Sequence, residues 1–350
     1  MKPLLVYPFS TDTMPVARYA QMLAEYDAVI PVVEWGAGDD VDGKDVSYFD
    51  GGGLVGTKLA TNFEGAIGHA GSVLFAGEIR NKEKAIEYVS LSRSFGKKIL
   101  ICESTRVSLG LPPDGCTVCS YEAYEAEVAH NDKLLGISVP VILVMGQGQQ
   151  CQKFDIQLGL RKKFIEEGYK VSQVGTKEYS ALFGFHALSR FPEIPLWRRT
   201  LLYNRFFHDI VNREKPDVLI VGAPGGTMAI DEYHNELFGE TAIGLATSLK
   251  PDIAIHSLYL SKVNEEYLSD VRNHTKYALG AEADYFHMSN TWLVFEQDRR
   301  TINHLTTDSG AVLESIGEII EKPFHVFMPE TCDFVYSDII SQLQGNIEMI

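Results

Sequence analysis

The sequence lacks the features that mark membrane, nucleic-acid-binding and disulfide-rich proteins. No stretch approaches the roughly 18 consecutive apolar residues that a membrane-spanning helix needs, so we expect no membrane partner. Residues 1–8 carry one positive charge and a short apolar run, without a small-residue cleavage site. They favour a first β-strand over a signal peptide and predict a cytoplasmic location.

Positive charge and cysteine are also scarce. The 31 Lys and Arg residues against 47 Asp and Glu residues give a net charge of −16. Sequence-independent nucleic-acid binding needs clustered cations, so we expect no nucleic-acid partner. Five cysteines in 350 residues argue against a disulfide framework. Cys116 and Cys119 form a single C-x-x-C, which is half of a tetrahedral zinc site, and we interpret them as thiols in an interdomain segment.

Apolar strands alternate with amphipathic helices in the first part of the chain. We expect strands at 4–7, 28–33, 72–76 and 98–102, and helices at 16–26, 62–70 and 82–95. Unbroken apolar runs between such helices are typical of parallel strands that are covered on both faces. The sequence therefore predicts a Rossmann-like parallel-sheet domain over residues 1–105.

The pattern is lost over residues 106–137, where Pro112, Pro113 and Gly115 precede an acidic segment. We expect a linker there. A second series follows, with expected strands at 139–145, 169–174, 217–221, 252–258 and 292–295, and helices at 154–168, 200–212 and 265–279. The fold class that we expect is α/β, with a second parallel-sheet domain over residues 138–350.

The loop from Gly146 to Lys153 joins the first strand of this second domain to its first helix. The order of strand, glycine loop, lysine and helix is used to cradle phosphates. Glycines let backbone N–H groups turn toward the anion, and the helix N-terminus and the lysine add positive charge. The loop departs from the pattern G-x-x-x-x-G-K-S/T: it is one residue longer, and Gln152 and Phe154 replace the second glycine and the magnesium-binding hydroxyl.

The longer spacing occurs in the P-loops of the dethiobiotin synthetase and cobyric acid synthase type. Aligned with that type, Gly146 is the first glycine, Gln152 the second and Lys153 the lysine. In that group a buried strand ends in a glutamate followed by Gly-Ala-Gly-Gly. Here the strand at 217–221 is followed by Gly222-Ala223-Pro224-Gly225-Gly226, which keeps the glycine pair and lacks the acid. Residues 138–300 thus resemble a degenerate P-loop NTPase domain.

The loop supplies most of the candidate site residues. The candidate ligand-binding residues are Gly146, Gly148, Gln152, Lys153, Gly225 and Gly226. The expected cofactor is ATP or another nucleotide with Mg²⁺. The candidate catalytic residues are Lys153, Asp155 and His234.

Asp155 and His234 each have two interpretations. Asp155 is a candidate magnesium ligand, because carboxylate oxygens are hard ligands; alternatively, its charge compensates the helix N-terminus. His234 follows Asp231, and such a carboxylate–histidine cluster could hold a metal or act as a general base. The alternative is a solvated polar loop.

Several short segments scattered over most of the chain form a further pattern. They are Tyr7-Pro8-Phe9, Arg18-Tyr19, Trp35-Gly36, Asp50-Gly51-Gly52, Lys153-Phe154-Asp155-Ile156-Gln157-Leu158, Gly222–Gly226 and Ser289-Asn290. In these segments the whole chain is similar to the family of peptide maturation system proteins found beside clostridial cysteine-rich peptide precursors and radical SAM maturases. The resemblance implies an accessory role in making a ribosomally encoded natural product, with a precursor peptide and a radical SAM maturase as partners. It transfers no catalytic residues.

Several functions fit these observations. The first is a nucleotide-dependent, ligase-like enzyme in which Lys153 and the loop amides stabilise phosphate charge. The second is a non-catalytic adaptor that presents a precursor peptide to a maturase. The third is a CoA-dependent N-acyltransferase, because a two-domain family with a more intact P-loop, including an N-acyltransferase acting on D-glutamate, looks like a more distant relative. The sequence leaves a homo-oligomer open.

Overall fold

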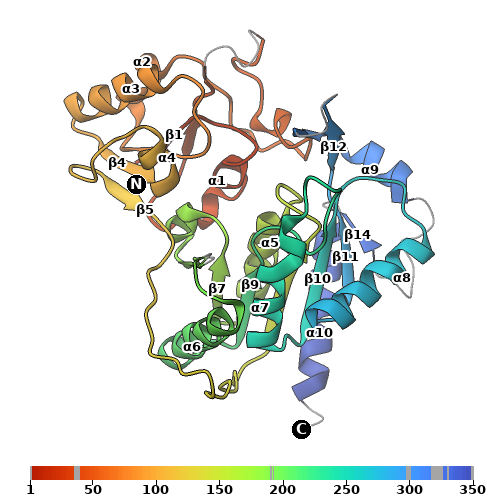
Figure 1. The fold of residues 1–350 in the computed structure, drawn as a ribbon. Helices are drawn as coiled ribbons and strands as arrows, with labels where there is room; N and C mark the ends of the chain where they lie inside the picture. Colours follow the sequence, from red (N-terminus) through yellow and green to blue (C-terminus); the bar gives the residue numbers. More distant parts are fainter. Residues whose placement is uncertain are drawn as a thin grey trace. The chain divides into compact units, whose positions relative to one another are not determined.

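The computed structural model of the protein describes residues 2–34, 40–189, 191, 193–296, 301–316, 326–328 and 331–347. The chain divides into two compact α/β units (Figure 1). The first unit is Met1–Tyr121 with Lys177–Ala187, and the second is Glu122–Thr176 with Leu188–Ile350. This division differs from the expected domains at 1–105 and 138–350 with a linker at 106–137. Trp35 and Gly36 lie outside the described residues.

The first unit contains a parallel sheet with the strand order β2-β1-β3-β4-β5, which is one of the common doubly wound orders. Its strands are β1 (Leu4–Tyr7), β2 (Val29–Pro31), β3 (Ser72–Phe75), β4 (Lys98–Cys102) and β5 (Thr117–Cys119). Its helices are α1 (Met14–Arg18), α2 (Phe63–Ala66), α3 (Lys82–Ser94) and α4 (Glu103–Ser108). Short 3₁₀ turns are η1 (Ala20–Met22), η2 (Val46–Tyr48) and η3 (Ile67–His69).

The segment that we expected to be a linker begins inside the first unit. Helix α4 continues directly from β4, and β5 pairs with β4 so that Cys119 lies opposite Cys102. Cys119 is buried, and this burial raises the pKa of its thiol to about 11. Cys116 lies 3.6 Å from the guanidinium of Arg93 on α3. The structure therefore places both thiols in the fold of the first unit and corrects the interpretation of an interdomain segment.

Residues 177–187 return to the first unit from a distant part of the sequence. They form η4 (Glu178–Phe183) and β8 (His186–Ala187). Lys177 forms an ion pair with Asp12, and the hydroxyl of Tyr179 donates a hydrogen bond of 2.6 Å to the backbone oxygen of Asp12. The loop after β1 is therefore held by a segment more than 160 residues further along the chain.

The second unit contains parallel strands in the order β14-β11-β10-β6-β9-β7, with β6 between β9 and β10. The strands are β6 (Val141–Gly146), β7 (Val171–Gly175), β9 (Val218–Gly222), β10 (Ile253–Leu258), β11 (Tyr285–Met288) and β14 (Val326–Phe327). The helices are α5 (Lys153–Glu166), α6 (Leu196–Glu214), α7 (Glu240–Leu249), α8 (Glu265–His274), α9 (Ser309–Ile316) and α10 (Cys332–Ile347), with turns η5 (Glu236–Gly239) and η6 (Thr275–Leu279).

Helices cover both faces of this sheet (Figure 1). Successive side chains of a strand point to opposite faces. Leu143 and Met145 of β6 therefore pack with α6 and α7, while Ile142 and Val144 pack with α5 and α10. All residues of β6 are buried, which explains its unbroken apolar sequence. The expected fold class is confirmed: the chain is α/β with two parallel sheets.

An antiparallel ribbon of two strands forms a small separate sheet in the second unit. It consists of β12 (Thr291–Phe295) and β13 (Ile302–Thr306), and Trp292 lies opposite Leu305. Strand β12 follows β11 directly, so the ribbon begins at the carboxyl end of the sheet. Among the described residues, no helix is both long and apolar enough to cross a membrane.

Candidate functional site

The loop of residues 147–152 connects the end of β6 to the start of α5. It lies at the carboxyl end of a parallel strand, where ligands bind in folds of this type. Gln150 and Gln152 have left-handed backbone conformations, with φ of 56° and 58°. These conformations are unfavourable for residues other than glycine. Left-handed residues in such a loop help to turn backbone N–H groups into a concavity that binds anions.

Lys153 is the first residue of α5, and only 8% of its surface is exposed. Its Nζ atom donates a hydrogen bond of 2.6 Å to the backbone oxygen of Gly148 and another to the backbone oxygen of Gly225. The structure thus brings Lys153, Gly148 and Gly225 together, as the sequence predicts. The ammonium lies at the positive end of a helix dipole, so positive charge is concentrated at this point.

The two glycines of the loop are required by close packing. A Cβ atom on Gly146 would lie 2.7 Å from the Sγ atom of Cys151 and 2.8 Å from the backbone oxygen of Ser257. A Cβ atom on Gly148 would lie closer than 3.0 Å to the hydroxyl of Tyr259. The loop therefore folds tightly against β10 and the residue after it.

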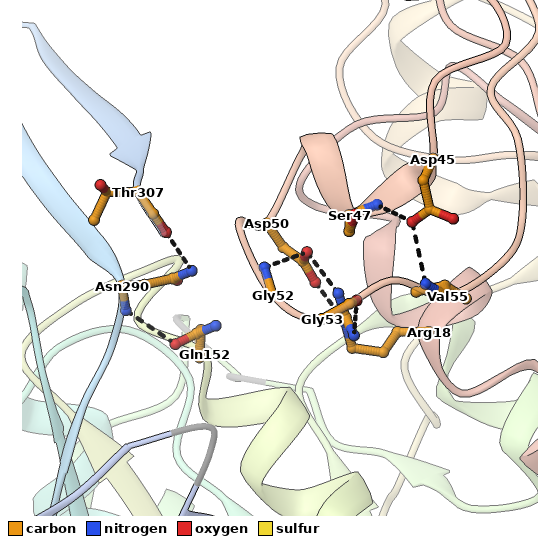
Figure 2. A network of polar contacts seen from close by, with 10 residues as sticks. All are labelled: Arg18, Asp45, Ser47, Asp50, Gly52, Gly53, Val55, Gln152, Asn290 and Thr307. Atoms are coloured by element: carbon orange, nitrogen blue, oxygen red, sulfur yellow. Dashed lines mark hydrogen bonds and ion pairs between the residues drawn. The ribbon is translucent and has the colours of Figure 1, made fainter. Parts of the chain in front are cut away.

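Gln152 stands where the related P-loops have glycine, and it is the N-cap residue of α5. Its side-chain oxygen accepts a hydrogen bond of 3.2 Å from the backbone N–H of Asn290. The side chain of Asn290 donates in turn to the backbone oxygen of Thr307 at 2.9 Å (Figure 2). The side chain of Gln152 is thus bound to the segment that carries the β12–β13 ribbon.

The residues present do not fit the magnesium site of a P-loop. The position of the hydroxyl residue holds Phe154, which is 4% exposed and packs in the core, and β9 ends in Val221 and Gly222 without an acid. Asp155 lies half-buried in the first turn of α5. Across the described parts of the chain, no group of three or more His, Cys, Asp and Glu side chains could hold a metal ion. A role for Asp155 in metal binding stays a prediction.

The turn after β9 contributes more than its glycine pair. Gly225 adopts a left-handed conformation with φ of 76°, and the buried Gly226 follows it. A Cβ atom on Gly222 would lie closer than 3.0 Å to the amide of Gln157. That amide donates a hydrogen bond of 3.2 Å to the backbone oxygen of Lys153. Gln157 therefore links the first turn of α5 to the end of β9, a contact that its place in the Lys153–Leu158 element did not predict.

His234 forms a local pair with Asp231. Its Nδ1 atom lies 2.9 Å from Oδ1 of Asp231, which also accepts hydrogen bonds from the backbone N–H groups of Tyr233 and His234. Burial acts to raise the pKa of Asp231, but these hydrogen bonds outweigh it and lower the pKa below its usual value. The side chain of Asp231 thus closes a turn. A catalytic role for His234 stays a prediction.

Two buried histidines lie near the loop. The Nε2 atom of His256 on β10 lies 2.8 Å from Oγ1 of Thr227, the residue after Gly226. The Nδ1 atom of His287 on β11 lies 2.9 Å from Oγ of Ser257. Burial lowers the pKa of each ring to about 3, and the charge of Lys153 acts in the same direction on His256. Both rings are therefore neutral, as expected of buried structural histidines.

Arg18 and Asp50, two of the residues that carry the family resemblance in the first unit, bind each other (Figure 2). Arg18 binds Asp50 through two hydrogen bonds of 2.5 and 2.7 Å and donates to the backbone oxygen of Gly53 at 3.1 Å. Such bidentate pairs combine strength with fixed geometry. Asp45 accepts hydrogen bonds from the backbone N–H groups of Ser47, Val55 and Gly56. These side chains hold the glycine-rich loop of residues 45–56.

No family model matches the sequence, and no curated protein matches it either. The fold is similar to that of a DUF1611 family protein from Anabaena variabilis, with a TM-score of 0.57, 9% identity, and coverage of 99% of this chain and 100% of that chain. It is less similar to the 54 kDa signal recognition particle protein from Aeropyrum pernix K1 in complex with GDP, with a TM-score of 0.33 and 14% identity over 61% of this chain and 48% of that one. A nucleotide-binding protein from Archaeoglobus fulgidus in complex with ADP gives a TM-score of 0.34 and 12% identity over 57% and 85% of the two chains. The first likeness shows that the two-unit α/β fold recurs over a whole chain, and the other two carry no argument about function.

Proposed function

We propose that the protein binds a phosphate-bearing ligand at residues 146–153. The observation that carries this proposal is the buried ammonium of Lys153 at the N-terminus of α5, beside a loop with left-handed residues at Gln150 and Gln152. An arriving phosphate would accept a hydrogen bond from Lys153 in exchange for one of its backbone acceptors, Gly148 or Gly225. The loop amides and the helix dipole would stabilise the remaining phosphate oxygens.

Local and long-range electrostatics oppose each other in this proposal. The chain carries a net charge of −16, which repels an anion at long range, over about 8 Å at physiological ionic strength. A charge-assisted hydrogen bond contributes about 1.5–3 kcal/mol at short range. Binding therefore depends on contacts within the loop, and affinity should hold or increase when salt screens the protein's overall charge.

The chemistry of the loop favours a diphosphate that binds without magnesium. Phe154 and Val221 stand at the positions where a P-loop of this type holds and orients Mg²⁺, and neither side chain can bind a metal. A nucleoside diphosphate meets this condition. So does the pyrophosphate of an acyl-CoA, which is the specific reason to keep a CoA-dependent N-acyltransferase as the second candidate function.

We further propose that the protein is an accessory factor in the maturation of a ribosomally made peptide. The support is the sequence resemblance at Lys153–Leu158 and the other segments that share it. On this proposal its partners are a precursor peptide and a radical SAM maturase. A non-catalytic adaptor would bind either partner with the same affinity whether or not a phosphate ligand is present, whereas an enzyme would turn over a modified peptide only with the ligand.

Calorimetric titration tests the phosphate site directly. The ligands are pyrophosphate, ADP, ATP and CoA, each with magnesium and with a chelator at constant ionic strength. We expect dissociation constants on the order of micromolar for at least one diphosphate. Preference for CoA over ADP would favour the acyltransferase. The absence of binding by all four ligands would contradict a working phosphate site and leave the adaptor as the better function.

A further inference from the structure

The phosphate loop is held by two side chains from one distant segment. The hydroxyl of Ser257, in β10, donates a hydrogen bond of 2.5 Å to the backbone oxygen of Cys151. The hydroxyl of Tyr259, just after β10, donates to the backbone oxygen of Gln149. Side chains two residues apart on an extended chain lie on the same face. Ser257 and Tyr259 are two residues apart in the sequence, and so are Cys151 and Gln149, whose backbone oxygens they hold.

Holding a carbonyl orients the N–H group of the same peptide. The peptide unit is planar and trans, so its C=O and N–H bonds point in opposite directions. The peptide of the Gln149 oxygen carries the N–H of Gln150, and that of the Cys151 oxygen carries the N–H of Gln152. When Ser257 and Tyr259 hold these oxygens on the side of β10, both N–H groups point away from β10.

The same two residues are the ones with left-handed backbones. Gln150 and Gln152 follow the anchored carbonyls directly, and their φ values are 56° and 58°. A left-handed conformation in a residue other than glycine persists only where surrounding contacts impose it. The hydrogen bonds from Ser257 and Tyr259 are contacts of this kind.

Tyr259 also contacts the loop at Gln147 and Gly148. Its backbone N–H donates 2.7 Å to the side-chain oxygen of Gln147, and its hydroxyl and ring lie against Gly148. The backbone oxygen of Gly148 is one of the two acceptors of the Lys153 ammonium. Tyr259 is thus linked to the lysine through a single residue of the loop.

The proton of Ser257 has a fixed direction. A hydroxyl has one proton to donate, and that of Ser257 is donated to Cys151, so its oxygen accepts from the Nδ1–H of His287 at 2.9 Å. The buried His287 ring is neutral, and this arrangement requires its Nδ1–H tautomer. Turning the hydroxyl of Ser257 toward His287 would break its bond to the loop.

We infer that Ser257 and Tyr259 are the positioning residues of the phosphate site: they hold alternate carbonyls of the loop and thereby aim the N–H groups of Gln150 and Gln152 at the anion. This inference rests on the proposed function. It adds to the proposed function an origin of the loop conformation outside the loop, in Ser257 of β10 and in Tyr259 just after it.

The test compares Ser257→Ala and Tyr259→Phe with variants that lose the same kind of bond elsewhere. The control for the serine is Ser92→Ala, which removes a buried hydroxyl that donates 2.7 Å to the backbone oxygen of Tyr88. The control for the tyrosine is Tyr179→Phe, which removes a hydroxyl that donates 2.6 Å to the backbone oxygen of Asp12. Both controls lie in the first unit. All four variants should lose similar amounts of thermal stability.

The readouts are the dissociation constant for pyrophosphate and the shift of the loop amide signals in ¹H–¹⁵N spectra. We expect Ser257→Ala and Tyr259→Phe each to weaken binding by about 3- to 30-fold and to reduce the pyrophosphate-induced shifts at Gln152 and Gln150 respectively. The controls should bind like the wild type. Stability loss without a change in affinity or in these shifts would overturn the inference.

The failure of this inference is distinguishable from failure of the proposed function. If the wild-type protein binds pyrophosphate and both variants bind it equally well, only the positioning role is overturned. If the wild-type protein does not bind pyrophosphate, ADP or CoA, the phosphate site itself fails and the positioning role fails with it. Tyr259→Phe keeps the ring that packs on Gly148, so it remains a fair test even if Ser257→Ala does not fold.

Discussion

Replacing Lys153 by methionine should separate the affinity of the phosphate site from the stability of the fold. Methionine is close to lysine in length but has no charge and donates no hydrogen bond. The substitution leaves the backbone oxygens of Gly148 and Gly225 without the ammonium, and each buried acceptor that loses its donor costs about 1–3 kcal/mol. It also removes a charge that is only 8% exposed, whose desolvation costs several kcal/mol.

These two contributions to stability have opposite signs and similar size. We therefore expect the free energy of unfolding to change by less than about 2 kcal/mol in Lys153→Met. The affinity for a diphosphate is compensated less, because the variant loses the attraction of the ammonium for the phosphate, a charge-assisted hydrogen bond of about 1.5–3 kcal/mol. The dissociation constant should rise by about 10- to 150-fold.

The assay is calorimetric titration with ADP and pyrophosphate, beside urea denaturation of the unliganded protein. The matched control is Lys97→Met, because Nζ of Lys97 also donates to backbone oxygens, at 2.7 Å from Ala70 and 3.4 Å from Gly68, in the first unit. It should alter stability modestly and leave affinity unchanged. If Lys153→Met binds both ligands within about threefold of the wild type, the ammonium does not contact phosphate and our reasoning about the loop is wrong.

Two further predictions concern stability, the first in the second unit and the second in the first unit. Gly239→Ala should lower the free energy of unfolding by about 2–4 kcal/mol in urea denaturation, because φ is 78° and a Cβ atom would lie closer than 3.0 Å to the backbone oxygen of Thr227. The control Gly168→Ala, with φ of 90° and no atom within 4 Å of the added Cβ, should lower it by about 1 kcal/mol. Equal losses in the two variants would refute the steric argument. Burial acts to raise the pKa of Asp45, but backbone hydrogen bonds outweigh this effect and lower the pKa in the folded state. The ionised side chain of Asp45 therefore stabilises the fold above the unfolded pKa of about 3.9, and this stabilisation is lost as pH falls through the folded pKa. Denaturation series from about pH 6 to 2.5 should show this loss in the wild type and a flatter profile in Asp45→Asn, and identical profiles would contradict it.

Local patterns predicted the central strands of both sheets because those strands are buried on both faces. The runs at β1 and β6 are apolar without interruption, and those at β3 and β10 are apolar apart from Ser72, His256 and Ser257; parallel strands under helices favour such runs. Strand β5 escaped prediction because it has three residues, is partly exposed and follows a proline-rich turn. The place of residues 177–187 in the first unit was not predicted, because it depends on contacts with Asp12. Hydrophobic periodicity predicts local elements and gives no information on contacts between residues so far apart in the sequence.

The candidate site was predictable to the extent that it is local. Strand, glycine loop and helix are continuous in the sequence, so the meeting of Lys153 with Gly148 followed from the motif. Gln152 was selected as a substitute for glycine, but the structure shows why a glutamine is tolerated there: its side chain is held by Asn290. Ser257 and Tyr259 could not be selected from the sequence. A serine in an apolar strand and a tyrosine after it do not indicate that their hydroxyls bind backbone oxygens of a loop about 110 residues earlier.

The substitutions in the loop predict how magnesium should affect binding. A P-loop with a hydroxyl after the lysine and an acid at the end of the second strand binds the metal–nucleotide complex, whereas this protein has Phe154 and Val221 there. The free diphosphate is then the preferred ligand, and millimolar Mg²⁺ should leave the affinity for pyrophosphate unchanged or lower it by sequestering the anion. Titrations with magnesium and with a chelator, at equal ionic strength, measure this. A tenfold increase in affinity with magnesium that Asp155→Asn abolishes would instead establish Asp155 as a metal ligand and reverse the conclusion.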